Sequence, residues 1–159
     1  MAATLNTLFC LHDDNTLWRR DSKEETTEWI RIGTGPSTGT RALAALAGML
    51  YAVDANGQLW RAVASSLDPP CWTQPQIQWS VDPTVSSMCA DADILYASTC
   101  DNRLLKSNRD FIAEANGWVS IHDCGPSLGL AVVDGCLFRV TSNNRLCRLD
   151  LSGLRRGWR

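Results

Sequence analysis

Long hydrophobic runs, basic patches and export signals are all missing from this sequence. No apolar stretch is long enough to span a bilayer, and the opening letters MAATLNTLFCL contain neither the basic start nor the cleavage site of a secretory signal. The net charge is −2 and the pI is near 5.6, with no basic patch interleaved with aromatic residues. We therefore expect no membrane insertion and no nucleic-acid partner.

Histidine is scarce, and no metal-binding pattern is present. The two histidines, His12 and His122, lie outside helix-borne metal motifs, and neither HExxH nor CxxC occurs. The nearest approach to a reactive cluster is His122–Cys124, which we interpret as a turn after a strand. The glycine-rich segment Gly33–Thr40 lacks the lysine of a phosphate-binding loop. We expect no enzyme activity, no catalytic residue, no metal and no cofactor.

Cysteine is abundant, but its arrangement argues against a disulfide framework. The count is odd, and the positions do not repeat in phase: Cys10, Cys71, Cys89, Cys100, Cys124, Cys136 and Cys147. Because no export signal is visible, we expect a reducing cytoplasmic location, where most of these thiols are small, unpaired and buried.

One sequence unit recurs four times along the chain. The copies open at positions 42, 45 and 42 residues apart, which is the period of a four-stranded propeller blade. Each begins with a leucine and an aromatic residue, carries a turn pair six and seven residues later, and then restarts with a leucine followed two places on by a base. The copies read LFCLHDDNTLW from Leu8, LYAVDANGQLW from Leu50, LYASTCDNRLL from Leu95 and LFRVTSNNRLC from Leu137.

The unit predicts three kinds of strand. Its centre is a hairpin, for which the pair Asn56-Gly57 indicates a two-residue type I′ turn. A small-residue apolar run before each later hairpin, such as Arg41–Gly48, predicts the inner strand, in spite of its helix-favouring alanines and leucines. A tryptophan after each hairpin marks the outer strand: Trp29, Trp72, Trp118 and Trp158.

These observations predict an all-β fold, a small β-propeller of about four four-stranded blades in one domain, 1–159. The repeats cover approximately 2–34, 42–80, 85–122 and 129–159. The sequence stops where the fourth outer strand would start, so we expect the last blade to be incomplete. Closure is then expected from the N-terminal segment AATLN or from a second chain in a homo-oligomer, because unpaired edge strands recruit partners.

The hairpin LYAVDANGQLWR and the tryptophans in phase behind it resemble the tectonin repeat of tectonin and tachylectin-like β-propeller lectins. The resemblance extends from Leu8 to Trp158 and implies a non-enzymatic protein that binds sugars, including methylated ones, in pockets between blades. This sequence departs from the pattern at Leu105 and Cys147, which replace the second-strand tryptophan, and in having four copies rather than five to seven. Equivalent sites in every blade are therefore not implied.

Tryptophan faces and in-phase bases carry the binding hypothesis. Sugar rings pack C–H groups on tryptophan faces, while their hydroxyls need planar polar partners. The candidate ligand-binding residues are Trp18, Trp60, Trp79, Arg19, Arg61, Lys106 and Arg148. Packing between blades and salt bridging are the structural alternative for these residues. The alternative function is a protein-binding module, such as an adaptor or a cytoplasmic inhibitor, that uses one rim and the unrepeated loop Leu67–Trp79.

Overall fold

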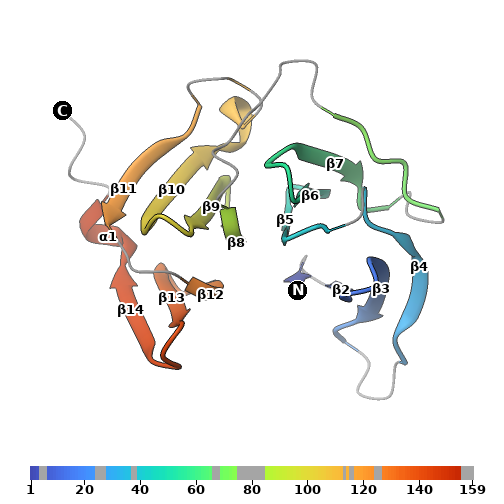
Figure 1. The fold of residues 1–159 in the computed structure, drawn as a ribbon, viewed down its shortest axis with the longest axis horizontal. Coiled ribbons are helices and arrows are strands. Elements are labelled where there is room, and N and C mark those ends of the chain that lie inside the picture. Colours follow the sequence, from blue (N-terminus) through green and yellow to red (C-terminus); the bar gives the residue numbers. More distant parts are fainter. Residues whose placement is uncertain are drawn as a thin grey trace.

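Four small antiparallel sheets are arranged one after another about a common centre (Figure 1). The computed structural model describes residues 1–3, 7–23, 28–36, 39–65, 69–74, 85–112, 114, 117–123 and 127–154. Each sheet is one blade, and the blades follow one another in chain order, from the blue first blade to the red fourth blade. The predicted all-β propeller is confirmed. Trp79 and Trp158 lie outside the described residues.

The first and third blades each have four strands in the predicted order from inner to outer. The first blade consists of β1 (Ala2–Ala3), β2 (Thr7–Leu11), β3 (Thr16–Asp21) and β4 (Ile30–Thr34). The third consists of β8 (Val85–Asp91), β9 (Ile94–Thr99), β10 (Arg103–Asn108) and β11 (Val119–Asp123). Trp29 and Trp118 directly precede the outer strands, close to where the repeat places them.

The second and fourth blades show three described strands each. The second blade consists of β5 (Ala42–Leu46), β6 (Met49–Val53) and β7 (Leu59–Val63). The fourth consists of β12 (Ser127–Val133), β13 (Cys136–Thr141) and β14 (Leu146–Asp150). In the second blade, a single bridge from Arg61 to Thr73 marks the outer position.

Helix is almost absent from the described part of the chain. It amounts to the 3-10 turn η1 (Arg109–Phe111) and the short helix α1 (Leu151–Leu154). Among these described residues, no helix is long and apolar enough to cross a membrane. The alanine-rich segment before the second hairpin is the strand β5, which confirms that the repeat, rather than helix propensity, decides its structure.

The hairpin turn differs from the predicted two-residue type I′ turn. In the second blade, Gly57 donates its backbone N–H to the Asp54 carbonyl oxygen at 3.0 Å, and Asp54 donates to the Gln58 carbonyl oxygen at 3.1 Å. This pattern is a longer loop, a type I turn followed by one left-handed residue. Only the second residue of each turn pair has a positive φ: Asn15, Gly57, Asn102 and Asn144. Asp54 stabilises the loop, because its carboxylate accepts hydrogen bonds from two backbone N–H groups.

Side chains that alternate along the strands pack each blade against the next. We call the face toward the following blade the front face and the opposite face the back face. On the front faces of the first three blades, an aromatic residue and a leucine are buried at matching repeat positions: Phe9 and Leu17, Tyr51 and Leu59, and Tyr96 and Leu104. The back faces of the second and third blades contribute Leu50 and Leu95. Each buried leucine contributes about 2 kcal/mol to folding.

The N-terminal strand belongs to the first blade. Ala2 and Ala3 pair antiparallel with Phe9 and Leu8 of β2. The inner strands then follow in order, with β1 beside β5, β5 beside β8 and β8 beside β12. The expectation that the N-terminal segment completes the fourth blade is therefore wrong, because this segment is already used as the inner strand of the first.

Candidate binding site

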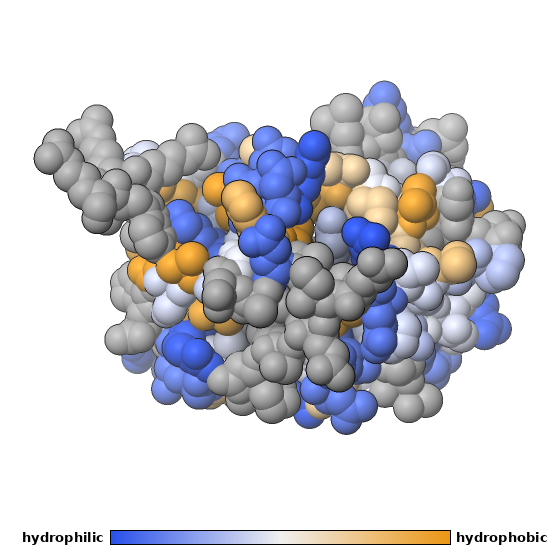
Figure 2. All heavy atoms as spheres, turned by 90° about the horizontal axis from the view of Figure 1, so that it is seen from above, coloured by the Kyte–Doolittle hydropathy of each residue, from blue (hydrophilic) through white to orange (hydrophobic). Residues whose placement is uncertain are grey.

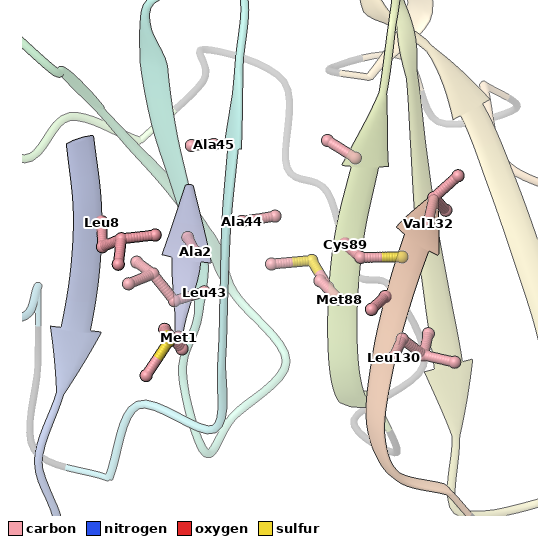
Figure 3. Close-up of a pocket in the computed structure, with 12 residues that line it drawn as sticks. Met1, Ala2, Leu8, Leu43, Ala44, Ala45, Met88, Cys89, Leu130 and Val132 are labelled. Carbon is pink, nitrogen blue, oxygen red and sulfur yellow. The ribbon is translucent and has the colours of Figure 1, made fainter. Parts of the chain in front are cut away.

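The centre of the propeller is an apolar cavity of about 290 Å³. Ala44 on β5 and Met88 on β8 point toward each other across it, while Cys89 of β8 points the other way, toward the strand β12 that carries Leu130 and Val132 (Figure 3). All four blades contribute to the lining: Met1, Ala2, Leu8, Leu43, Ala44, Ala45, Met88, Cys89, Ala90, Leu130, Ala131 and Val132. These side chains offer hydrocarbon and sulfur but no nitrogen or oxygen, so backbone groups supply the polar part of the lining.

Cys89 shows how apolar this centre is. Burial is the main cause that raises the pKa of its thiol to about 12, and the nearby Asp91 carboxylate adds to the effect. The thiol therefore stays protonated at neutral pH and is a poor nucleophile, because the thiolate is the reactive form. A site at which charged side chains bind a ligand therefore lies elsewhere.

A second pocket, of about 370 Å³, lies at one end of the third blade. We call it the Lys106 pocket, after the one predicted binding residue that lines it. It has a mixed lining: Ile94, Lys106, Ser107, Asn108, Phe111, Glu114, Gly117 and Val119. Its volume is within the range of small-molecule sites. Phe111 is half exposed here, and both signs of charge are present in Lys106 and Glu114.

The loop after β10 builds this pocket through a chain of local hydrogen bonds. The Asn108 side chain accepts a hydrogen bond from the backbone N–H of Asp110 and so caps η1. The backbone N–H of Glu114 donates to the Phe111 carbonyl oxygen at 3.0 Å, and that of Gly117 donates to the Glu114 carbonyl oxygen at 3.0 Å. A Cβ on Gly117 would lie 1.8 Å from the Phe111 carbonyl oxygen, so only glycine allows this approach.

Trp118 fixes the same loop to the body of the propeller. Its indole N–H donates to the Ile112 carbonyl oxygen at 3.2 Å, and Ile112 is buried in the core between the second and third blades. The ring of Phe111, one residue earlier, stays half exposed at the pocket. The loop thus presents an aromatic ring from a fixed base.

A third pocket, of about 510 Å³, lies between the first and second blades. Its lining is formed mainly by small or apolar side chains: Thr7, Phe9, Ala45, Leu46, Ala47, Gly48, Ala64 and Ser65. Arg19 is paired with Phe9 across β2 and β3 and is exposed on the same front face, but Thr7 and Ser65 are the polar side chains of the lining itself. This is an inter-blade pocket of the kind that the resemblance implies, with few polar groups.

Trp18 and Trp60 are half-buried on the back faces of their blades. The Trp60 indole N–H donates to the buried Asp54 carboxylate at 3.1 Å, and its ring packs against the core between the first two blades. The Trp18 indole N–H donates to the Thr16 hydroxyl at 2.8 Å, and its ring stacks on His12 with centroids 5.5 Å apart. Thr16 in turn donates to Asp14, which holds the pKa of that carboxyl below its usual value.

The four in-phase bases lie on the front faces, opposite the tryptophan positions. Each is paired across two strands with the aromatic residue of its own blade: Arg19 with Phe9, Arg61 with Tyr51, Lys106 with Tyr96 and Arg148 with Phe138. Burial raises the pKa of Tyr51, while the charge of Arg61 opposes that rise. Arg148 also donates to the Cys136 sulfur at 3.1 and 3.2 Å. The structure thus brings each base beside an aromatic ring, whereas Trp79 is not described.

Sequence reasoning did not identify Asn108, Phe111 and Glu114, because they lie outside the repeated unit. It also passed over the spacing Gly35-x-Ser-x-Gly39, which matches the nucleophile elbow of α/β-hydrolases. That elbow requires a strand followed by a helix, whereas here the segment joins strands β4 and β5. No cluster of histidine, cysteine, aspartate or glutamate among the described residues is arranged to hold a metal ion.

Comparison with known proteins supports the fold and leaves the family open. No protein-family model matches the chain, and no curated protein matches it significantly in sequence. The computationally designed Ika4 protein matches 94% of this chain and 88% of its own, at 10% identity and a TM-score of 0.57. A protein of unknown function from Bacteroides thetaiotaomicron matches 96% of this chain at 16% identity and a TM-score of 0.70.

A chain from the crystal structure of a nidogen/laminin complex matches 96% of this chain at 12% identity and a TM-score of 0.65. The four blades cover only 45% of the Bacteroides chain and 59% of the chain from the nidogen/laminin complex. The chain thus spans about half the length of these two structures, and its blades match one part of each larger chain.

Proposed function

We propose that this protein is a non-enzymatic, lectin-like module that binds a neutral or methylated glycan in the Lys106 pocket. The observation that carries the proposal is the half-exposed Phe111 ring beside the polar groups of Lys106, Asn108 and Glu114. The tectonin-like hairpins support a sugar as the ligand, since lectins of that family bind sugars, but the Lys106 pocket is formed by one blade rather than between two. Lys106 is also one of the in-phase bases that the sequence singles out.

The chemistry of the pocket suits a sugar. An aromatic face packs against the C–H groups of a pyranose ring. Lys106 supplies N–H donors and Glu114 supplies acceptors. A sugar hydroxyl at the edge of the pyranose ring therefore finds a partner whether it donates or accepts a hydrogen bond. The aliphatic side chains of Ile94 and Val119 complete the lining and accommodate a methyl substituent.

A glycan array that includes methylated sugars tests this proposal, followed by titration calorimetry on the strongest ligand. Phe111→Ala is expected to weaken binding by about tenfold or more, because it removes the stacking face. Ile30→Ala is the matched control, since Ile30 is equally exposed but lies on β4 of the first blade. Unchanged binding by the Phe111→Ala variant, or a blank array with folded protein, would contradict the proposal.

A protein partner is the second candidate, because hydrophobic side chains stand exposed on the described surface. Phe111, Leu128, Val133 and Leu146 are at least half exposed, and Figure 2 shows separate hydrophobic groups among hydrophilic residues. One matching chain comes from a structure of two proteins in complex. A cytoplasmic adaptor or inhibitor that uses one rim fits these features, and a blank glycan array would favour it.

A further inference from the structure

The front face of the fourth blade is exposed at the repeat positions that are buried in the second blade. Leu59 is 2% exposed, whereas its equivalent, Leu146, is 70% exposed. Val53, which pairs with Leu59 across the hairpin, is 1% exposed, whereas Val140, which pairs with Leu146, is 38% exposed. The residue types are the same, and what differs is that no cluster among the described residues covers this face of the fourth blade.

The inner strands repeat this difference. Leu46 on β5 is 4% exposed, and Val133, at the matching position on β12, is 55% exposed. Phe138, which corresponds to the buried Tyr51, is only half-buried. Val133, Phe138, Val140 and Leu146 therefore form one apolar surface, which we call the open front.

The first blade has the complementary surface. On the second and third blades, the first leucine of the repeat lies on the back face and is fully buried, at Leu50 and Leu95. On the first blade, the matching Leu8 is only half-buried, as are Cys10 and Trp18 on the same face. We call Leu8, Cys10 and Trp18 the open back.

The chain does not bring these two surfaces together in the described structure. The three buried clusters lie between the first and second, second and third, and third and fourth blades. Among the described residues, no such cluster joins the fourth blade to the first. The four blades thus form an arc. At its two ends, apolar residues occupy the same repeat positions that are buried between neighbouring blades inside the arc.

We propose that the open front binds the open back of a second copy of this chain, and that two copies close a ring of eight blades. The argument is continuity with an existing interface: front-to-back packing at the same repeat positions already joins each blade to the next. Two copies related by a two-fold axis make two identical contacts and leave no free end. Eight blades lie within the usual range of propellers, whereas three copies would give twelve.

The first test is the mass of the purified protein in solution, measured by light scattering after size exclusion. The expected result is twice the chain mass of 17.5 kDa. Leu146→Glu places a charge in the open front and is expected to raise the dissociation constant by about a hundredfold. Val63→Glu is the control, because Val63 is also an exposed apolar residue but lies on the second blade, outside both open surfaces.

A mixing experiment tests the head-to-tail geometry. Trp18→Glu disrupts the open back, so neither it nor Leu146→Glu alone forms an intact contact, whereas a mixture of the two regains one of the two contacts. Circular dichroism melts establish that each variant is folded. A folded wild-type monomer, a mass other than two chains, a dimer unaffected by Leu146→Glu, or no association in the mixture would each overturn the proposal. This surface is separate from the Lys106 pocket, so its failure leaves the glycan proposal standing.

Discussion

The second and fourth blades are built from the same pattern but differ in how much of it they bury. All five residues of β5 are buried, as are four of the five in β6, whereas only one of the seven residues of the matching β12 and two of the six of the matching β13 are buried. Among the described residues, buried clusters join the second blade to two neighbours and the fourth blade to the third alone. A repeat residue therefore contributes to stability according to its place in the arc as well as its type.

The largest expected effect comes from truncating the matched leucines. Leu59→Ala should lower the free energy of unfolding by about 3 kcal/mol, because it opens a cavity in the core between two blades. Leu146→Ala should change it by less than about 0.5 kcal/mol, because the side chain is largely in solvent. Urea unfolding at a protein concentration too low for association measures both, and equal losses would show that the fourth blade is covered within one chain.

A smaller effect is expected at the hairpin turns, where the blades are alike. Gly57 has a φ of +76° and Asn144 a φ of +60°. Valine is strained in this left-handed region, so Gly57→Val should cost about 1–2 kcal/mol of stability. Asn144→Val should cost a similar amount, since the local conformation does not depend on burial. Thermal melts of the two variants test this, and an unchanged melting temperature for Gly57→Val would count against the left-handed turn.

High pH should weaken the packing of the third blade against its two neighbours, where Tyr51 and Cys89 lie. The pKa of Cys89 is raised from 9.0 to about 12, and that of Tyr51 is raised from 10.0, in both cases mainly by burial. Above pH 9 the unfolded chain loses the Cys89 proton while the folded chain keeps it, so stability falls as pH rises from 9 toward 12. Denaturant titrations across this interval should show the loss, and Cys89→Ala should reduce it.

The smallest effect concerns thiol reactivity within the third blade. Native alkylation followed by mass spectrometry should label the exposed Cys100 well before Cys89, which lines the central cavity. Equal labelling would mean that the centre opens readily to solvent.

Much of the fold was predictable because the repeat fixes where strands begin and which residues face the core. Leu50 and Tyr51 alternate onto the two faces of β6, as the leucine-aromatic pair predicts. The turn was predicted at the right place with the wrong geometry, because Asn56-Gly57 also suits a longer loop in which glycine alone is left-handed. The pairing of the N-terminal strand with β2 was not predicted, because this strand consists of two alanines, which show neither an alternating pattern nor a turn signal.

The candidate site was less predictable than the fold. Lys106 is in phase with the repeat and was identified as a candidate. Phe111 and Glu114 lie in the loop between β10 and β11, outside the repeated positions, so the repeat does not predict their role. The exposure of Leu146 leaves no trace in sequence, because Leu17, Leu59 and Leu104 occupy the same position and are buried. Position in the arc, and not residue type, sets this difference.

Hydrogen exchange of the backbone amides in β6 and β13, measured at several protein concentrations, tests the comparison most directly. Each is the middle strand of a three-stranded sheet, so the two are matched in hydrogen bonding. At low concentration we expect slow exchange in β6 and faster exchange in β13, and at high concentration slower exchange in β13 alone, as a second copy covers the open front. Equal protection of the two strands at every concentration would contradict an open arc.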